Sequence, residues 1–222
     1  MDKKKKWILI TISLFIISIV YIFLLKTIDI KPIGPKNSEI GFSTINRVFH
    51  DFTGNNTICY GISKYLGYLA FVIVIYYIIL GFLQLKTRKS ITKVDNRIIK
   101  LGVFYILVGL VYILFEKVII NYRPVILDGE LEASFPSSHT MLAICICLSS
   151  ILISKYYIKG PKLCKKINIA TIILMLVILL SRTLSGVHWI TDIIGGIIIS
   201  LCLVSCYYTM ILFDEKNTNQ KR

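Results

Sequence analysis

Residues 181–192 read Ser181-Arg182-Thr183-Leu184-Ser185-Gly186-Val187-His188-Trp189-Ile190-Thr191-Asp192. This stretch joins two long apolar runs, residues 167–184 and 193–213, each close to the length needed to cross a bilayer. Arginine, histidine and aspartate side chains are costly near hydrocarbon, and in membrane proteins they mark functional sites. The spacing of four residues between His188 and Asp192 places both on one face of a helix that begins here.

The residue types in this stretch suit chemistry on a phosphate group. A histidine whose far ring nitrogen donates to a carboxylate has a fixed tautomer and a more basic free nitrogen. The planar guanidinium of Arg182 matches the oxygens of a phosphate. The pattern therefore predicts a nucleophilic or acid–base histidine that acts on a phosphate. The alternative is a set of interfacial polar residues that cap the two helices.

The rest of the chain is strongly apolar. Of its 222 residues, 55% are hydrophobic, and its mean hydropathy is +0.73. A soluble domain of this size would not carry such long apolar runs, and their continuity argues against a β-barrel. We expect an all-α, polytopic membrane protein that forms a single domain over residues 1–222. Its six transmembrane helices are expected at residues 7–25, 66–85, 98–115, 140–158, 167–184 and 193–213.

The formal net charge of +14 is explained by the expected topology. With both termini cytoplasmic, the inner segments hold 18 of the 26 Lys and Arg residues but 4 of the 12 Asp and Glu residues. The basic excess then lies on the cytoplasmic face, as the positive-inside rule expects, and indicates no nucleic-acid partner. We expect a plasma-membrane protein whose connections 116–138 and 183–192 both lie outside. The polar residues of the two connections can then meet at one extracytoplasmic surface.

Two smaller signals lie outside these connections. Residues 40–52 mix apolar and polar side chains, which predicts a short interfacial helix, and His50 within it has no partner at catalytic spacing. Gly102 and Gly109 lie on one face of the third apolar run, which predicts close contact with a neighbouring helix.

The connection between the third and fourth runs contains further cations and a helix start. Lys117 and Arg123 supply two positive charges. In the sequence Phe135-Pro136-Ser137-Ser138-His139, the two serines are good N-cap residues for the fourth helix. Backbone N–H groups at a helix N-terminus bind anions, and His139 would stand beside them.

Acidic residues are also present in this connection. Asp128, Glu130 and Glu132 lie close together, but no histidine is interleaved with them. We interpret them as a solvated acidic loop, and we expect neither a metal site nor a cofactor.

Together these stretches resemble the signature of the type-2 phosphatidic acid phosphatases, also called lipid phosphate phosphatases. The family pattern is Lys-x6-Arg-Pro, then Pro-Ser-Gly-His, then Ser-Arg-x5-His-x3-Asp. The third part is matched in full by Ser181, Arg182, His188 and Asp192, and the second differs only by Ser138 in place of glycine. The resemblance extends over about residues 98–213, the expected catalytic core.

The first part of the signature is imperfect. Only five residues, not six, separate Lys117 from Arg123-Pro124, and Glu116 occupies the position where the family has lysine. Lys117 is therefore displaced by one position along the helix.

The resemblance implies a core bundle of transmembrane helices and a role for each matched residue. His188 attacks phosphorus and becomes a phosphohistidine, and Asp192 orients it. His139 protonates the leaving oxygen and later activates water. No metal takes part. The phosphate oxygens are bound by Lys117, Arg123, Ser137, Ser138 and Arg182.

The implied function is that of an integral membrane lipid phosphatase, with a lipid phosphate as substrate and membrane lipids as surroundings. Candidate substrates are undecaprenyl diphosphate, phosphatidylglycerol phosphate and phosphatidic acid. Two alternatives stay open. A phosphotransferase would differ only in the acceptor that replaces water. A non-catalytic lipid-binding or transport protein on the same scaffold is favoured by the displaced lysine.

Overall fold

Six helices in the computed structural model are long and apolar enough to cross a membrane. The structure describes residues 2–127 and 129–219, so that Asp128 lies outside the described residues. The six long helices are α1 (Lys3–Leu25), α3 (Thr57–Arg88), α4 (Asn96–Lys117), α5 (Ser138–Tyr157), α6 (Pro161–Leu184) and α7 (Ile190–Asn219). Shorter elements are η1 (Pro35–Asn37), α2 (Ser43–Thr53) and η2 (Ile91–Lys93). The prediction of an all-α membrane protein with six spanning helices is confirmed.

The helices extend beyond the predicted spans, most of all at the start of α3. This helix begins at Thr57, whereas the apolar run that predicted it begins at Leu66. The Asn56 side chain accepts a hydrogen bond from the backbone N–H of Cys59 at 3.0 Å and so caps the helix. Hydropathy detects the part of a helix that lies in hydrocarbon, and α3 continues past it.

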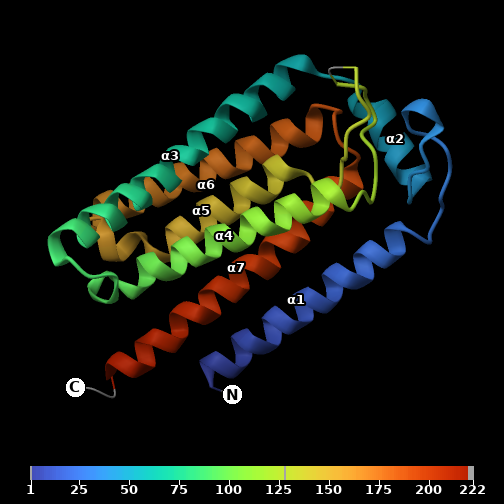
Figure 1. Ribbon diagram of the computed structural model, residues 1–222. Coiled ribbons are helices and arrows are strands. Elements are labelled where there is room, and N and C mark those ends of the chain that lie inside the picture. The colour runs from blue at the N-terminus through green and yellow to red at the C-terminus, as the bar shows by residue number, and fades with distance from the viewer. Residues whose placement is uncertain (1, 128, 220–222) are drawn as a thin grey trace.

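Helix α5 lies at the centre of the bundle (Figure 1), where it packs against α3, α4, α6 and α7. It is also the most buried span, whereas α1 lies at the edge and packs chiefly on α7. The outer helices present large apolar side chains at their surfaces, among them Phe15, Phe23 and Phe82. Such a surface is expected where the solvent is lipid.

Glycines decide where chain segments approach one another. A Cβ on Gly195 of α7 would lie 2.1 Å from Cε2 of Phe135, so this glycine lets the segment before α5 lie directly on α7. The prediction for Gly102 and Gly109 is wrong, because a Cβ on either would meet no atom of the described residues within 4 Å. Gly102 instead lines a cavity of about 130 Å³ between α3 and α4, together with Gly81 and Ile98.

The two ends of the bundle differ. The start of α1 and the end of α7 lie at one end (Figure 1). At the opposite end, the connection that follows α4 lies beside the turn between α6 and α7. The two connections singled out in the sequence therefore meet at the end of the molecule far from the termini.

Candidate functional site

The connection between α4 and α5 is fixed by backbone pairing before it reaches the site. Tyr122 and Ala133 form an antiparallel bridge, and the N–H of Ser134 donates to the carbonyl of Asn121 at 2.9 Å. The indole Nε1 of Trp189 donates to the carbonyl of Tyr122 at 2.8 Å. This pairing places the Asn121 and Ser134 side chains together over the start of α7.

The turn between α6 and α7 depends on Gly186. Its φ of +71° is in the left-handed region, and a Cβ there would lie 1.9 Å from the carbonyl oxygen of Gly54. The N–H of Asn56 donates to the carbonyl of Ser185 at 3.1 Å. The segment that precedes α3 therefore holds the turn that carries His188.

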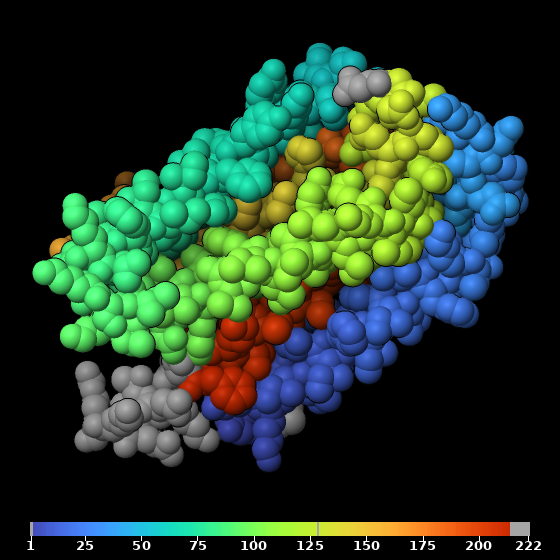
Figure 2. Space-filling view, viewed as in Figure 1, coloured from blue at the N-terminus to red at the C-terminus, as the bar shows by residue number. Residues whose placement is uncertain are grey.

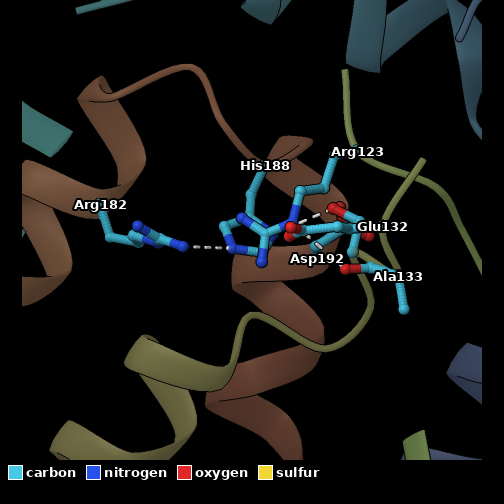
Figure 3. A network of polar contacts seen from close by, with 7 residues as sticks. Arg123, Glu132, Ala133, Arg182, His188 and Asp192 are labelled. Carbon is cyan, nitrogen blue, oxygen red and sulfur yellow. Dashed lines mark hydrogen bonds and ion pairs between the residues drawn. The ribbon is translucent and has the colours of Figure 1, made fainter. Parts of the chain in front are cut away.

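His188 is almost completely buried, with 4% of its surface exposed. Its Nε2 lies 2.9 Å from Nη2 of Arg182 (Figure 3). A guanidinium can only donate hydrogen bonds, so Nε2 accepts and the ring proton lies on Nδ1. Nδ1 lies 2.9 Å from Oγ of Ser134, which accepts from it. The atom that faces the arginine is therefore the one with the free lone pair.

The environment of His188 favours the neutral ring. Burial lowers the pKa of His188 well below its ordinary value, and the charges of Arg182 and Arg123 lower it further. His139 contributes to the pKa of His188 in the same direction. A neutral imidazole is the form that can act as a nucleophile.

Asp192, in the first turn of α7, has no exposed surface. Its Oδ1 accepts from Nδ2 of Asn121 at 3.1 Å, and its Oδ2 accepts from the N–H of Trp189 at 3.1 Å. Oδ2 also accepts from Oγ of Ser134 at 2.5 Å. The structure thus brings Asp192 to His188 through Ser134, whereas the sequence pattern predicted a direct contact.

Two arginines converge on the site from different elements (Figure 3). Arg182 is 1% exposed, and its Nε and Nη1 have no hydrogen-bond partner among the described residues. Nε of Arg123 forms an ion pair with Oε2 of Glu132 at 3.0 Å and donates to the carbonyl of Ala133 at 3.3 Å. Its buried Nη1 has no partner among the same residues. Both guanidinium groups thus keep donors that an anion could occupy.

A cavity beside Arg123 is lined by three of the residues predicted for the site, Arg123, Ser138 and His188. Its walls include Tyr112, Phe115, Glu116, Arg123, Ala133, Ser134, Phe135, Pro136, Ser138, Met141 and His188. Glu116 lines this cavity, whereas Lys117, the next residue, is exposed and is not among the lining residues.

In the part of the chain that the structure describes, no group of three or more His, Cys, Asp or Glu side chains could hold a metal ion.

The start of α5 offers backbone donors to the same cavity. Ser137 is the N-cap residue, and its own N–H donates to the carbonyl of Asp192 at 3.1 Å. The Ser137 hydroxyl accepts from Thr140 at 3.0 Å and makes no capping bond to the helix. The first N–H groups of α5, from Ser138 onward, are therefore left for an anion.

His139 points to a second cavity, on the side of the bundle. This cavity of about 170 Å³ is lined by Gly67, Tyr68, Ala70, Phe71, Tyr112, Ser138, His139, Leu142, Ala143 and Ile146. Figure 2 shows the corresponding hollow, where α5 is visible between α3 and α4. A Cβ on Gly67 would lie 3.2 Å from the His139 ring, so the glycine makes room for the imidazole. Ser138 and Tyr112 line both cavities, so the two cavities are neighbours.

Sequence reasoning thus located most of the residues that meet here but missed Ser134 and Asn121. Both are single polar residues in a polar connection, and their partner Asp192 is more than 50 positions away, at separations of 58 and 71 residues. The one available signal is position, because Ser134 stands directly before the Phe135-Pro136-Ser137-Ser138-His139 sequence and Asn121 stands two residues before Arg123.

The chain is similar to known proteins in sequence and in fold. The family model described as the PAP2 superfamily matches residues 99–216. A search of curated proteins gave no match. Among solved structures, the fold is similar to that of a transmembrane PAP2-type phosphatidylglycerolphosphate phosphatase from Bacillus subtilis, with a TM-score of 0.58 and 21% identity. That match covers 93% of this chain and 96% of the other. Because the family model matches more than half of its residues, the chain belongs to the PAP2 superfamily of type-2 phosphatidic acid phosphatases.

Proposed function

We propose that the protein is a membrane lipid phosphatase in which Nε2 of His188 attacks phosphorus to form a phosphohistidine. Family membership supports phosphatase activity on a lipid phosphate. The observation that carries the mechanism is the 2.9 Å contact between Arg182 Nη2 and His188 Nε2. It sets the ring tautomer and directs the nucleophilic lone pair toward a buried cation. A phosphate attacked by Nε2 would lie against that same cation.

The two arginines would bind the non-bridging oxygens. When a phosphate enters, Nη2 of Arg182 would leave Nε2 and bond an oxygen of the phosphate, which frees the lone pair for attack. The unpartnered Nε and Nη1 of Arg182 and Nη1 of Arg123 supply further donors. Phosphoryl transfer needs mainly positioning and charge stabilisation, and fixed arginines supply both without a metal.

His139 is placed to serve the leaving group. It lines the 170 Å³ cavity between α3, α4 and α5, while Ser138 next to it lines the cavity that contains Arg123 and His188. A lipid whose tail lies in the 170 Å³ cavity would place its ester oxygen between the two cavities. His139 would protonate that oxygen as the bond to phosphorus breaks, and would then take a proton from the attacking water. Ser137 and Lys117 are weaker candidates for phosphate binding, because the N–H of Ser137 is occupied and Lys117 lies outside the cavity.

A non-catalytic lipid-binding protein is the second candidate, and the placement of Glu116 favours it. A carboxylate in the wall of a phosphate site weakens anion binding, and Glu132 already pairs with Arg123. A carrier, however, has no need of a histidine whose tautomer is fixed by hydrogen bonds at both ring nitrogens. The phosphatase is therefore the better account of the geometry.

The site would open to the outer face of the plasma membrane. The segments at the end of the bundle that holds the termini carry the basic excess, and the positive-inside rule supports a cytoplasmic location for that end. A fluorescent protein fused after residue 222 should therefore fluoresce, and alkaline phosphatase fused there should stay inactive. The reverse result would place the site on the cytoplasmic side.

Phosphate release from purified protein tests the function. The protein in detergent, with EDTA present, would be given phosphatidylglycerol phosphate, phosphatidic acid and undecaprenyl diphosphate in parallel. We expect release from at least one lipid by the native chain and none by His188→Asn. Folded native protein that releases no phosphate from any of them would favour the carrier or a phosphotransferase.

A further inference from the structure

The Asp192 carboxylate and the His188 ring are joined by a third side chain. Among the described residues, the hydrogen bonds of the His188 ring go to Ser134 and Arg182, and those of the carboxylate come from Ser134, Asn121 and Trp189. Ser134 is the shared partner, and it is 2% exposed. Any influence of the carboxylate on the ring through hydrogen bonds therefore passes through one hydroxyl.

The direction of each hydrogen bond in this chain is determined. Nε2 must accept from Arg182, so the proton of the neutral ring is on Nδ1, and Nδ1 donates to Ser134 Oγ. The Ser134 O–H then donates to Oδ2 of Asp192. If the ring proton were on Nε2 instead, Nε2–H would face a guanidinium N–H of Arg182, and two donors would lie 2.9 Å apart.

Ser134 is held in place for this task by its own backbone. Its N–H donates to the carbonyl of Asn121 at 2.9 Å, and the Asn121 side chain in turn donates to Oδ1 of Asp192 at 3.1 Å. The Asn121 and Ser134 side chains therefore each donate a hydrogen bond to a different oxygen of the Asp192 carboxylate. The hydroxyl has little freedom to turn elsewhere, because its donor and its acceptor are both buried.

We propose that Ser134 is a positioning residue that carries the effect of Asp192 to His188 through two hydrogen bonds, an inference that rests on the proposed phosphohistidine chemistry. During attack the Nε2–P bond forms and the bond from phosphorus to the leaving oxygen breaks, with the proton for that oxygen supplied by His139. The ring becomes an imidazolium that keeps its proton on Nδ1. The Nδ1–H···Oγ–H···Oδ2 chain strengthens as this charge develops, and no proton needs to move along it.

Kinetics of a double-mutant cycle provide the first test. Ser134→Ala should lower kcat about 10- to 100-fold and change KM less than about threefold, because the arginines that bind phosphate remain. If Asp192 acts through Ser134, Asp192→Asn should cost far less in the Ser134→Ala background than in the native one. Equal costs in both backgrounds would show that Asp192 acts on His188 by another route, and native kcat in Ser134→Ala would overturn the proposal.

A matched control separates this role from a general loss of packing. Ser154 is a serine of α5 with 1% exposure whose hydroxyl donates to a helix carbonyl, that of Ile151, at 3.1 Å. Ser154→Ala should leave kcat unchanged. Thermal unfolding of both variants in detergent would show whether either has lost its fold.

A spectroscopic reading does not depend on activity. The chain has 3 histidines, so ¹⁵N-histidine labelling with a His188→Asn reference assigns the His188 signals. We expect the Nδ1–H tautomer in the native protein and also in Ser134→Ala, because Arg182 fixes it, and a shifted Nδ1 resonance in the variant, because Nδ1–H loses its acceptor. An Nε2–H tautomer in the native protein would overturn the relay even if phosphate is released. No phosphate release with the expected tautomer would instead reject the proposed function alone.

Discussion

Arg182 and His188 face each other at 2.9 Å, and both are nearly inaccessible to solvent, with 1% and 4% of their surfaces exposed. The arginine is six residues before the histidine, at the last turn of α6, and the turn through Gly186 brings the two side chains together. Among the described residues no carboxylate forms an ion pair with Arg182, whose guanidinium carbon lies 5.4 Å from the centre of the Tyr60 ring. The arrangement is therefore well suited to receive an anion, and less suited to stability alone.

Replacing Arg182 by lysine should reduce catalysis strongly. Lysine keeps the charge but lacks the planar set of donors that can bond a phosphate and the ring in turn. We expect kcat to fall by about 10²-fold or more in phosphate-release assays of Arg182→Lys. Arg97→Lys is the matched control, since Arg97 lies at the other end of the bundle beside Tyr156. A kcat for Arg182→Lys within threefold of the native value would contradict this role.

The pH dependence of stability should reveal the depressed pKa of His188. An unfolded histidine has a pKa of about 6.5, whereas burial and two arginines lower the pKa of the folded residue well below that value. Below pH 6.5 the unfolded chain binds a proton that the folded chain does not bind. The free energy of unfolding should therefore decrease as the pH falls, by at most about 1.4 kcal/mol per pH unit from this residue.

Thermal unfolding of the native protein and of His188→Asn between pH 8 and pH 5 measures this contribution. The native protein should lose more stability than the variant over that range. Parallel curves for the two proteins would show that His188 is not buried in its neutral form.

Glu116, rather than Lys117, should affect phosphate binding. Glu116 lines the cavity with Arg123 and His188, and its negative charge opposes that of the substrate. We expect Glu116→Gln to lower KM severalfold, and to lower the inhibition constant of inorganic phosphate similarly. Lys117→Ala serves as the neighbouring control and should change KM by less than twofold. A large rise of KM in Lys117→Ala would instead show that the displaced lysine reaches the substrate.

Substitutions at two helical glycines should have opposite effects on stability. A Cβ on Gly195 would clash with the Phe135 ring at 2.1 Å, so Gly195→Ala should destabilise the protein by about 1–3 kcal/mol and disturb the segment that carries Ser134. Gly102→Ala meets no described atom within 4 Å and should stabilise α4 by about 0.5–1 kcal/mol. Unfolding temperatures in detergent check both, and a stabilised Gly195→Ala would contradict the observed packing.

Much of the fold could be predicted from hydropathy, because each span must present an apolar surface to lipid over a fixed thickness. The ends of the helices could not, since capping and continuation depend on local partners such as Asn56 at the start of α3. The contact expected at Gly102 and Gly109 was also wrong. Their spacing showed that they share a face, but not which face of α4 turns toward its neighbours.

The part of the site that could be predicted consists of residues that lie close together in the sequence. His188 and Asp192 share one motif, but α7 begins at Ile190, so His188 lies in the turn before the helix and not on the helix face that the spacing predicted. Ser134 enters the site through the antiparallel pairing of residues 122 and 133, which has no signature in an irregular connection. The sequence pattern could therefore name both ends of the hydrogen-bond chain, but not the hydroxyl that joins them.

Trapping of a covalent intermediate tests the central claim most directly. The native protein would be mixed with a ³²P-labelled lipid phosphate, quenched in alkaline denaturant that preserves phosphohistidine, and digested for peptide mapping. We predict acid-labile label on the peptide that contains His188, and none in His188→Asn. Phosphate release without label on that peptide, or label on His139 or His50 instead, would contradict the account.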